Sequence, residues 1–159
     1  MREILFRGKR KDNGEWVEGY YTELPCGSLG ATIFSNDDEL VCEDTKSYII
    51  KVFTKQHTNY SNSNPLQVIE CEKYEVIPET VGQFTGLTDK NGKKIFEGDI
   101  VHGYWNTKFL IFFDLCCLQF RAKLSDGTEK DIDYYGDSKK IEVIGNIYDN
   151  PELLRSENG

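Results

Sequence analysis

One stretch of the sequence, residues 77–101, constrains the fold more than any other. It reads IPETVGQFTGLTDKNGKKIFEGDIV and holds four glycines, none of them in the order of a phosphate-binding loop. It ends in EGDIV (residues 97–101), and a Gly-Asp pair followed by β-branched residues is typical of a chain entering the first strand of a small barrel. The stretch therefore indicates an architecture and does not indicate a reaction.

The first half of the chain predicts a β-hairpin followed by short strands. Residues 3–11 and 15–23 flank Asp12-Asn13-Gly14, a turn in which glycine can take a positive φ angle. Their side chains alternate with a period of two, which fits strands and not helices. Further strands are predicted at residues 31–34, 40–42, 47–53 and 66–77. Residues 56–65, rich in asparagine and serine, are predicted to form an exposed loop.

The second half predicts five short strands at residues 99–104, 108–113, 117–124, 128–134 and 140–148. Short helical turns are expected at residues 78–82 and after Asn150, which would act as an N-cap. Strands of this length and spacing predict a small SH3-like barrel. We expect an all-β protein with very short helices, in which an N-terminal β-hairpin and sheet part (residues 1–78) precedes a small C-terminal β-barrel (residues 79–159).

Several motifs together carry a family resemblance. Besides the central stretch, the motifs are residues 6–8 (FRG), 14–17 (GEWV), 143–148 (VIGNIY) and 150–154 (NPELL). With these motifs the chain resembles the YopX family, small proteins of bacteriophages and prophages. The resemblance covers both ends and the centre, and is weak over residues 25–70 and 105–140. It implies a phage-encoded, cytosolic, non-secreted and oligomeric protein, and it supplies no catalytic residues to carry over.

Charge and hydropathy limit the partners. The 159 residues carry a net charge of -8, so a nucleic-acid backbone would be repelled unless a local patch overrode the total. No apolar run is long enough for a transmembrane helix, and the N-terminus lacks the apolar core of a secretory signal. We therefore expect no membrane contact and a cytoplasmic location in a bacterial host.

The cysteines predict neither a metal site nor a disulfide framework. The five cysteines include the adjacent pair Cys116-Cys117 and no C-x-x-C motif, and the two histidines are His57 and His102. Free thiols packed as small apolar residues in a reducing cytosol explain the pattern. A switch based on a vicinal disulfide is the alternative for the adjacent pair. No cofactor and no metal are predicted.

A catalytic reading depends on Glu97 and Asp99, which would share a face of a regular strand. Paired carboxylates can act as acid and base or hold a divalent ion. The alternative is that Asp99 caps the turn while Glu97 is solvated. His102 would point away from Asp99, and the apolar setting of Cys116 and Cys117 should raise a thiol pKa, which disfavours a nucleophile. We expect no enzymatic activity.

One basic cluster stands out in this acidic chain. It forms a candidate binding patch with two aromatic residues across the predicted hairpin: Arg7, Lys9, Arg10, Lys11, Trp16 and Tyr20. Positive charge beside aromatic rings is a common way to bind single-stranded nucleic acid. The alternative is a solvated hairpin end whose basic residues blunt a sheet edge.

The predicted function is binding and not catalysis. Phe109, Phe112, Phe113 and Phe120 alternate only partly, which favours a barrel core plus a subunit contact. We expect a phage or prophage accessory protein that binds a host or phage protein and forms a homo-oligomer. The alternative is a nucleic-acid-binding small-barrel protein, which the total charge disfavours.

Overall fold

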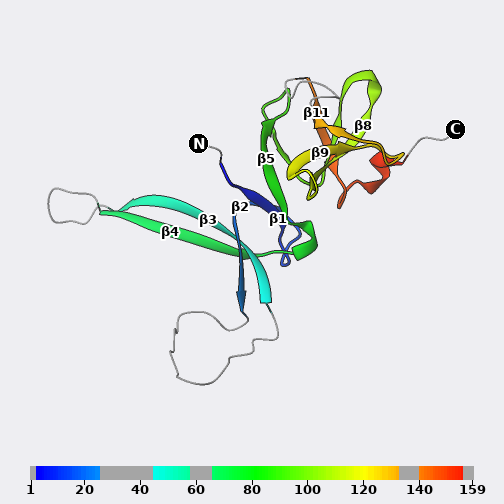
Figure 1. Ribbon diagram of the computed structural model, residues 1–159. Helices are drawn as coiled ribbons and strands as arrows, with labels where there is room; N and C mark the ends of the chain where they lie inside the picture. The colour runs from blue at the N-terminus through cyan, green and yellow to red at the C-terminus, as the bar shows by residue number, and fades with distance from the viewer. Residues whose placement is uncertain (1–2, 26–44, 58–65, 133–139, 156–159) are drawn as a thin grey trace. The chain divides into compact units, whose positions relative to one another are not determined.

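The computed structural model describes residues 3–25, 45–57, 66–132 and 140–155 (Figure 1). Contacts divide the chain into two compact units, one of residues 5–81 and one of residues 82–159 with residues 1–4. The predicted strands at residues 31–34 and 40–42 lie outside the described residues. None of the helices in the described part is long and apolar enough to cross a membrane.

The N-terminal unit contains four antiparallel strands in the order β4-β3-β2-β1. They are β1 (Phe6–Lys9), β2 (Trp16–Pro25), β3 (Thr45–His57) and β4 (Leu66–Glu75). β1 and β2 form the predicted hairpin, and Gly14 in its turn has a φ of 73°. The period-two pattern therefore identified these two strands correctly.

The β3–β4 pair extends beyond the rest of this sheet (Figure 1). β2 pairs with β3 only as far as Ile50, whereas β3 and β4 stay paired from Tyr48 to His57. The prediction that an exposed loop begins at Gln56 is wrong, because Gln56 and His57 pair with Gln67 and Leu66. Pairing with the next strand along the chain outweighs the polar composition of the segment.

One face of the N-terminal sheet forms its core. Val17, Ile49 and Val76 are buried there, and Phe6, Tyr21, Tyr74 and Val81 pack against them. The 3-10 helix η1 (Pro78–Thr80) follows the predicted helical turn, and the Thr80 hydroxyl accepts a hydrogen bond from the Lys9 amide at 2.9 Å.

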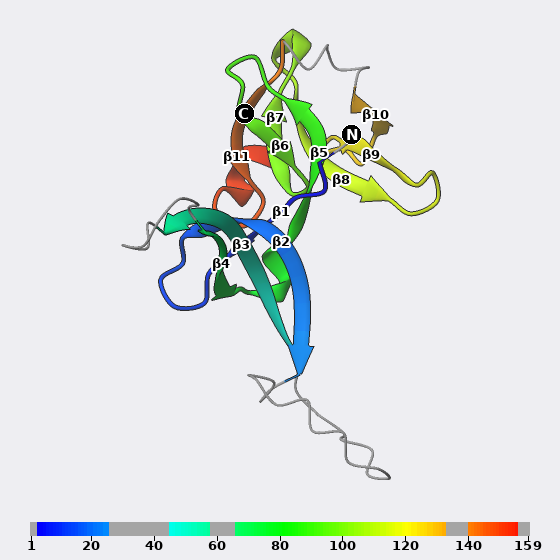
Figure 2. The same ribbon diagram turned by 90° about the vertical axis from the view of Figure 1, so that its left-hand side faces the viewer.

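The C-terminal unit is also antiparallel (Figure 2). β5 (Gly82–Thr88) pairs with β6 (Lys94–Phe96), and a five-stranded sheet has the order β10-β9-β8-β7-β11. Its strands are β7 (Asp99–His102), β8 (Lys108–Asp114), β9 (Gln119–Lys123), β10 (Glu129–Asp131) and β11 (Glu142–Asn146). No pairing among the described strands closes either sheet into a barrel, so the predicted SH3-like barrel stays a prediction. Short 3-10 turns, η2 (Tyr104–Asn106) and η4 (Pro151–Leu154), follow β7 and β11.

The central sequence stretch enters a strand as predicted, since β7 begins at Asp99. A cluster that includes Ile95, Val101, Phe109 and Ile111 forms the core around it. Phe109 is thus a core residue, in agreement with the sequence pattern. The N-cap prediction is wrong in one respect: Asn150 precedes η4, but its side chain makes no capping hydrogen bond.

Candidate functional site

The carboxylates proposed as a catalytic pair bind backbone amides. Asp99 is 1% exposed, and its Oδ2 accepts a hydrogen bond from the Phe96 amide at 2.8 Å. Glu97 Oε1 accepts one from the Phe113 amide at 3.3 Å. These contacts match the structural alternative for Asp99. No cluster of three or more potential metal ligands occurs in the described residues.

Strand register divides the basic patch between two faces of the N-terminal sheet. Opposed residues of an antiparallel pair point to the same face, and β1 places Arg7 opposite Glu18 and Lys9 opposite Trp16. Tyr20 lies on that same face, two residues beyond Glu18 in β2. Arg10 instead faces the core side, where its Cζ lies 4.5 Å from the centre of the Tyr74 ring.

Two patch residues have local partners that reduce their availability. Arg7 is only 8% exposed, and its Cζ lies 4.8 Å from the centre of the Trp16 ring. The Arg10 guanidinium donates to both carboxylate oxygens of Asp12, at 2.9 and 2.5 Å. That hydrogen bonding lowers the pKa of Asp12. Neither arginine offers an exposed cation of the kind predicted.

Lys11 remains at the surface but shares an acidic partner. Its Nζ lies 2.9 Å from Glu75 Oε1, and Lys46 Nζ lies 3.2 Å from Glu75 Oε2. Hydrogen bonds from Lys11 and then from Lys46 lower the pKa of Glu75, so this carboxylate stays charged at neutral pH. Two ammonium groups thus surround one carboxylate.

An exposed apolar hairpin tip, residues 115–118 between β8 and β9, is the feature that sequence reasoning missed. Leu115 is 79% exposed and Leu118 is 74% exposed, and Cys116 and Cys117 are exposed as well. Four uncharged side chains in water at one turn form an apolar patch of the kind that marks a binding site. The available signal was the break between the strands predicted at residues 108–113 and 117–124, which places the LCCL run (residues 115–118) at a hairpin end.

Asp114 holds the backbone of this tip. Its Oδ1 accepts hydrogen bonds from the amides of Cys116 at 2.8 Å and Cys117 at 3.3 Å. Its Oδ2 lies 2.8 Å from Arg121 Nη1. The hydrogen bond from Arg121, followed by the one from the Cys116 amide, lowers the pKa of Asp114 to about 2. At neutral pH the Asp114 carboxylate is therefore charged, and its hydrogen bonds hold the backbone of the tip in one turn.

The cysteines differ from their predicted environment. Packing as small buried residues is wrong for Cys71, Cys116 and Cys117, which are exposed. The predicted rise of a thiol pKa is confirmed for Cys117, but the main cause is its hydrogen bond to Asp114 and the charge of that carboxylate. The carboxylate of Asp114 thus disfavours the reactive thiolate form of Cys117.

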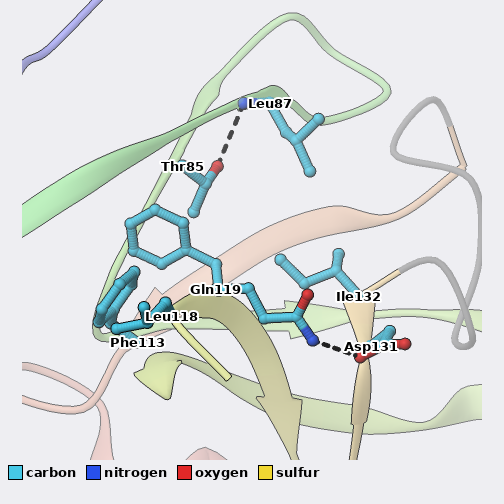
Figure 3. Close-up of a pocket in the computed structure, with 8 residues that line it drawn as sticks. Thr85, Leu87, Phe113, Leu118, Gln119, Asp131 and Ile132 are labelled. Atoms are coloured by element: carbon cyan, nitrogen blue, oxygen red, sulfur yellow. Dashed lines mark hydrogen bonds between the residues drawn. The ribbon is translucent and has the colours of Figure 1, made fainter. Parts of the chain in front are cut away.

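A hollow of about 440 Å³ adjoins the tip (Figure 3). Its lining includes Leu87, Leu118 and Ile132, and the Phe113 and Phe120 rings meet edge to face with centres 5.1 Å apart. Its polar residues are Thr85, Gln119 and Asp131. Gln119 Nε2 donates to Asp131 Oδ1 at 3.0 Å, as the dashed line in Figure 3 shows. The hollow can accept an apolar side chain beside a carboxylate.

These features define an all-β protein of two antiparallel units with an apolar hairpin tip. The chain belongs to the YopX protein family, whose model matches residues 5–155. A solved structure, protein EF1440 from Enterococcus faecalis, is similar with a TM-score of 0.51 and 24% sequence identity. That match covers 98% of this chain and 100% of the other, and it bears on the fold alone. A comparison with curated proteins finds no match.

Proposed function

We propose that this chain is a non-catalytic, phage- or prophage-encoded accessory protein that binds a host or phage protein through the hairpin tip and the adjoining hollow. The observation that carries the proposal is the exposure of Leu115 and Leu118 beside a hollow lined by Phe113 and Phe120. Apolar anchors in pockets supply much of the energy of protein interfaces. A turn held by Asp114 is ordered before binding, which reduces the entropy cost of association.

The charges around the hollow specify the partner further. Asp131 lines the hollow, and Asp114 follows the lining residue Phe113 in β8. Arg121 Nη1 lies 2.8 Å from Asp114 Oδ2 and 3.6 Å from Glu129 Oε2. Lys123 Nζ also lies 2.9 Å from Glu129 Oε1, so two cations face three carboxylates and one negative charge remains. The partner segment therefore presents an apolar side chain next to a lysine or arginine.

Self-association belongs to the same proposal. The β3–β4 ribbon runs from Lys51 to His57 without pairing to β2, and an isolated two-stranded ribbon is marginally stable in water. A second copy of the chain would cover this ribbon. A mass above that of the 18.3 kDa monomer in light scattering is the expected sign. A cytoplasmic location and an SH3-like closure of the C-terminal strands complete the proposed picture.

The test uses tip variants that keep the fold. Leu118 has a φ of 52°, a conformation that asparagine tolerates better than leucine, so Leu118→Asn should not reduce stability. The variant Leu115→Asn/Leu118→Asn is compared with the native chain in pull-downs from nuclease-treated bacterial lysate, followed by affinity measurement on the purified partner. Because the two leucines are proposed as central anchors, we expect the double variant to lose about 2 kcal/mol or more of binding free energy, roughly a 30-fold weaker affinity.

Ile4→Asn is the matched control, because it also removes an exposed apolar side chain but lies outside the tip and the lining of the hollow. It should bind the partner like the native chain. A partner held equally by the tip variant and the native chain would overturn the proposed site. Recovery of no nuclease-resistant partner, or measured turnover of a phosphodiester substrate in a clean preparation, would overturn the protein-binding function.

A further inference from the structure

The N-terminal sheet has a second face, opposite its core, with an unusual composition. Register places Tyr20 opposite Ile50 and Ile50 opposite Lys73, while Val52 lies opposite Cys71. Tyr48 lies on the same side, two residues before Ile50. We call this set the tyrosine face: Tyr20, Tyr48, Ile50, Val52, Cys71 and Lys73.

The tyrosine face presents aromatic and apolar groups to water. Tyr20 is 56% exposed and Val52 is 52% exposed, and Cys71 and Lys73 are exposed too. Tyr48 is a diagonal neighbour of Tyr20 across the β2–β3 pair, within reach of a ligand that spans both rings. Lys73 Nζ lies 4.3 Å from the centre of the Tyr48 ring, so an ammonium group is held directly at an aromatic surface.

The charge on this side of the sheet opposes the charge of the whole chain. Its basic residues are Arg7, Lys9, Lys11, Lys46 and Lys73, and its acidic residues are Glu18 and Glu75. Five positive charges against two negative ones make this side net positive in a chain of net charge -8. The opposite side carries Arg10 and Lys51 among its described side chains. Against them stand Glu23, Glu70 and Glu72, together with Asp12 and Glu15, which pair with Arg10.

We infer that the tyrosine face binds single-stranded nucleic acid. Bases stack on the rings of Tyr20 and Tyr48, and Lys73 contacts a phosphate. Aromatic stacking combined with positive charge is sufficient for such binding without sequence readout, because every base presents a π-face. The face suits single strands and not a duplex, because paired bases are stacked on one another and hide their faces.

The inference is separate from the proposed protein-binding site at the hairpin tip, since it concerns the other unit and another ligand. It predicts weak, salt-sensitive binding, because the total charge of -8 opposes a polyanion. Fluorescence anisotropy with labelled oligonucleotides of about 15 nucleotides, the upper part of the usual site size, measures it at low salt. Separate measurements with oligo-dT and oligo-U distinguish DNA binding from RNA binding. A duplex probe should bind more weakly than either single strand.

Two charge-reversal variants distinguish binding at the tyrosine face from a general effect of net charge. Lys73→Glu and Lys51→Glu change the net charge equally, but Lys51 lies on the core side near Tyr74. Lys73→Glu should weaken binding and reduce the slope of log affinity against log salt by about 0.7, the value for one single-strand phosphate contact. Lys51→Glu should change affinity little.

Aromatic substitutions test the stacking. Tyr20→Ser should weaken binding by roughly five- to a hundredfold, and Tyr20→Trp should retain it. Absence of an anisotropy change at protein concentrations of about 10⁻⁴ M would overturn the inference, since non-specific binding is usually seen by then. Equal losses in Lys73→Glu and Lys51→Glu would overturn it as well. So would a nuclease-resistant protein complex that Tyr20→Ser disrupts in the absence of oligonucleotide binding.

Discussion

At the scale of single residues, Gly98 shows why the central stretch has its particular composition. Its φ is 82°, its amide donates to the Ile111 carbonyl at 2.8 Å, and its carbonyl accepts from the Ile147 amide at 2.9 Å. A Cβ at this position would lie 3.1 Å from Tyr148 Cε2. Glycine is therefore required both by the backbone conformation and by the close approach of a ring.

Gly98→Ala should destabilise the protein more than Gly92→Ala. Gly92 has nearly the same φ, 81°, but a Cβ there would meet nothing within 4 Å. A left-handed residue other than glycine costs about 1–2 kcal/mol, so we expect about 1 kcal/mol for Gly92→Ala. For Gly98→Ala we expect about 3 kcal/mol, because the ring contact adds to the same backbone strain. Urea unfolding measures both, and equal losses would show that the Tyr148 contact is unimportant.

At the scale of elements, the β8–β9 hairpin combines an apolar tip with an ionic base. Asp114 joins the two strands through Arg121 and holds the tip amides of Cys116 and Cys117. Its lowered pKa means that the folded state favours the charged carboxylate. The stabilisation it supplies is complete above its ordinary pKa of about 3.9 and is lost as pH falls through the folded value.

Acid titration followed by NMR should therefore show the Cys116 and Cys117 amide signals shifting with a midpoint near pH 2, the pKa of Asp114. In Arg121→Gln the pKa of Asp114 should move up toward its ordinary value, because the largest cause of the shift is removed. The Asp114→Asn variant is the control and should show no such transition. A midpoint near pH 4 in the native chain would contradict the tip geometry.

At the scale of the whole molecule, each unit has its own buried cluster. One contains Val17, Ile49 and Val76, and the other is the larger cluster around Ile95 and Phe109. Separate cores are the property that allows separate folding. That residues 1–78 and 79–159 act as independent domains remains a prediction.

The two tryptophans, Trp16 and Trp105, offer a test of this prediction, one in each unit. In the single-tryptophan variants Trp16→Phe and Trp105→Phe, denaturant titration followed by fluorescence should give two different midpoints. Independent domains with cores of different size unfold at different denaturant concentrations. Coincident transitions in both variants and in circular dichroism would show instead that the chain unfolds as one cooperative unit.

Local patterns in the sequence identified much of the fold. The alternation around Gly14 predicted β1 and β2, and the Gly98-Asp99 step predicted the start of β7. Such features depend on neighbours in the chain, namely the period of two in strands and the freedom of glycine at positive φ. The family membership also followed from motifs visible in the sequence.

The candidate sites depended on contacts that no local pattern contains. Arg7 is buried and Cys116 exposed, contrary to what their residue types suggest. The tyrosine face arises because β2, β3 and β4 align in one register, which brings Lys73 onto Tyr48.

The sequence by itself thus determined the all-β class, the turns and the family, because these follow from short-range geometry. Only the tertiary structure decided which side chains face water. Burial is set by partners far apart in the chain, such as the Asp89 carboxylate that accepts a hydrogen bond from the Val143 amide.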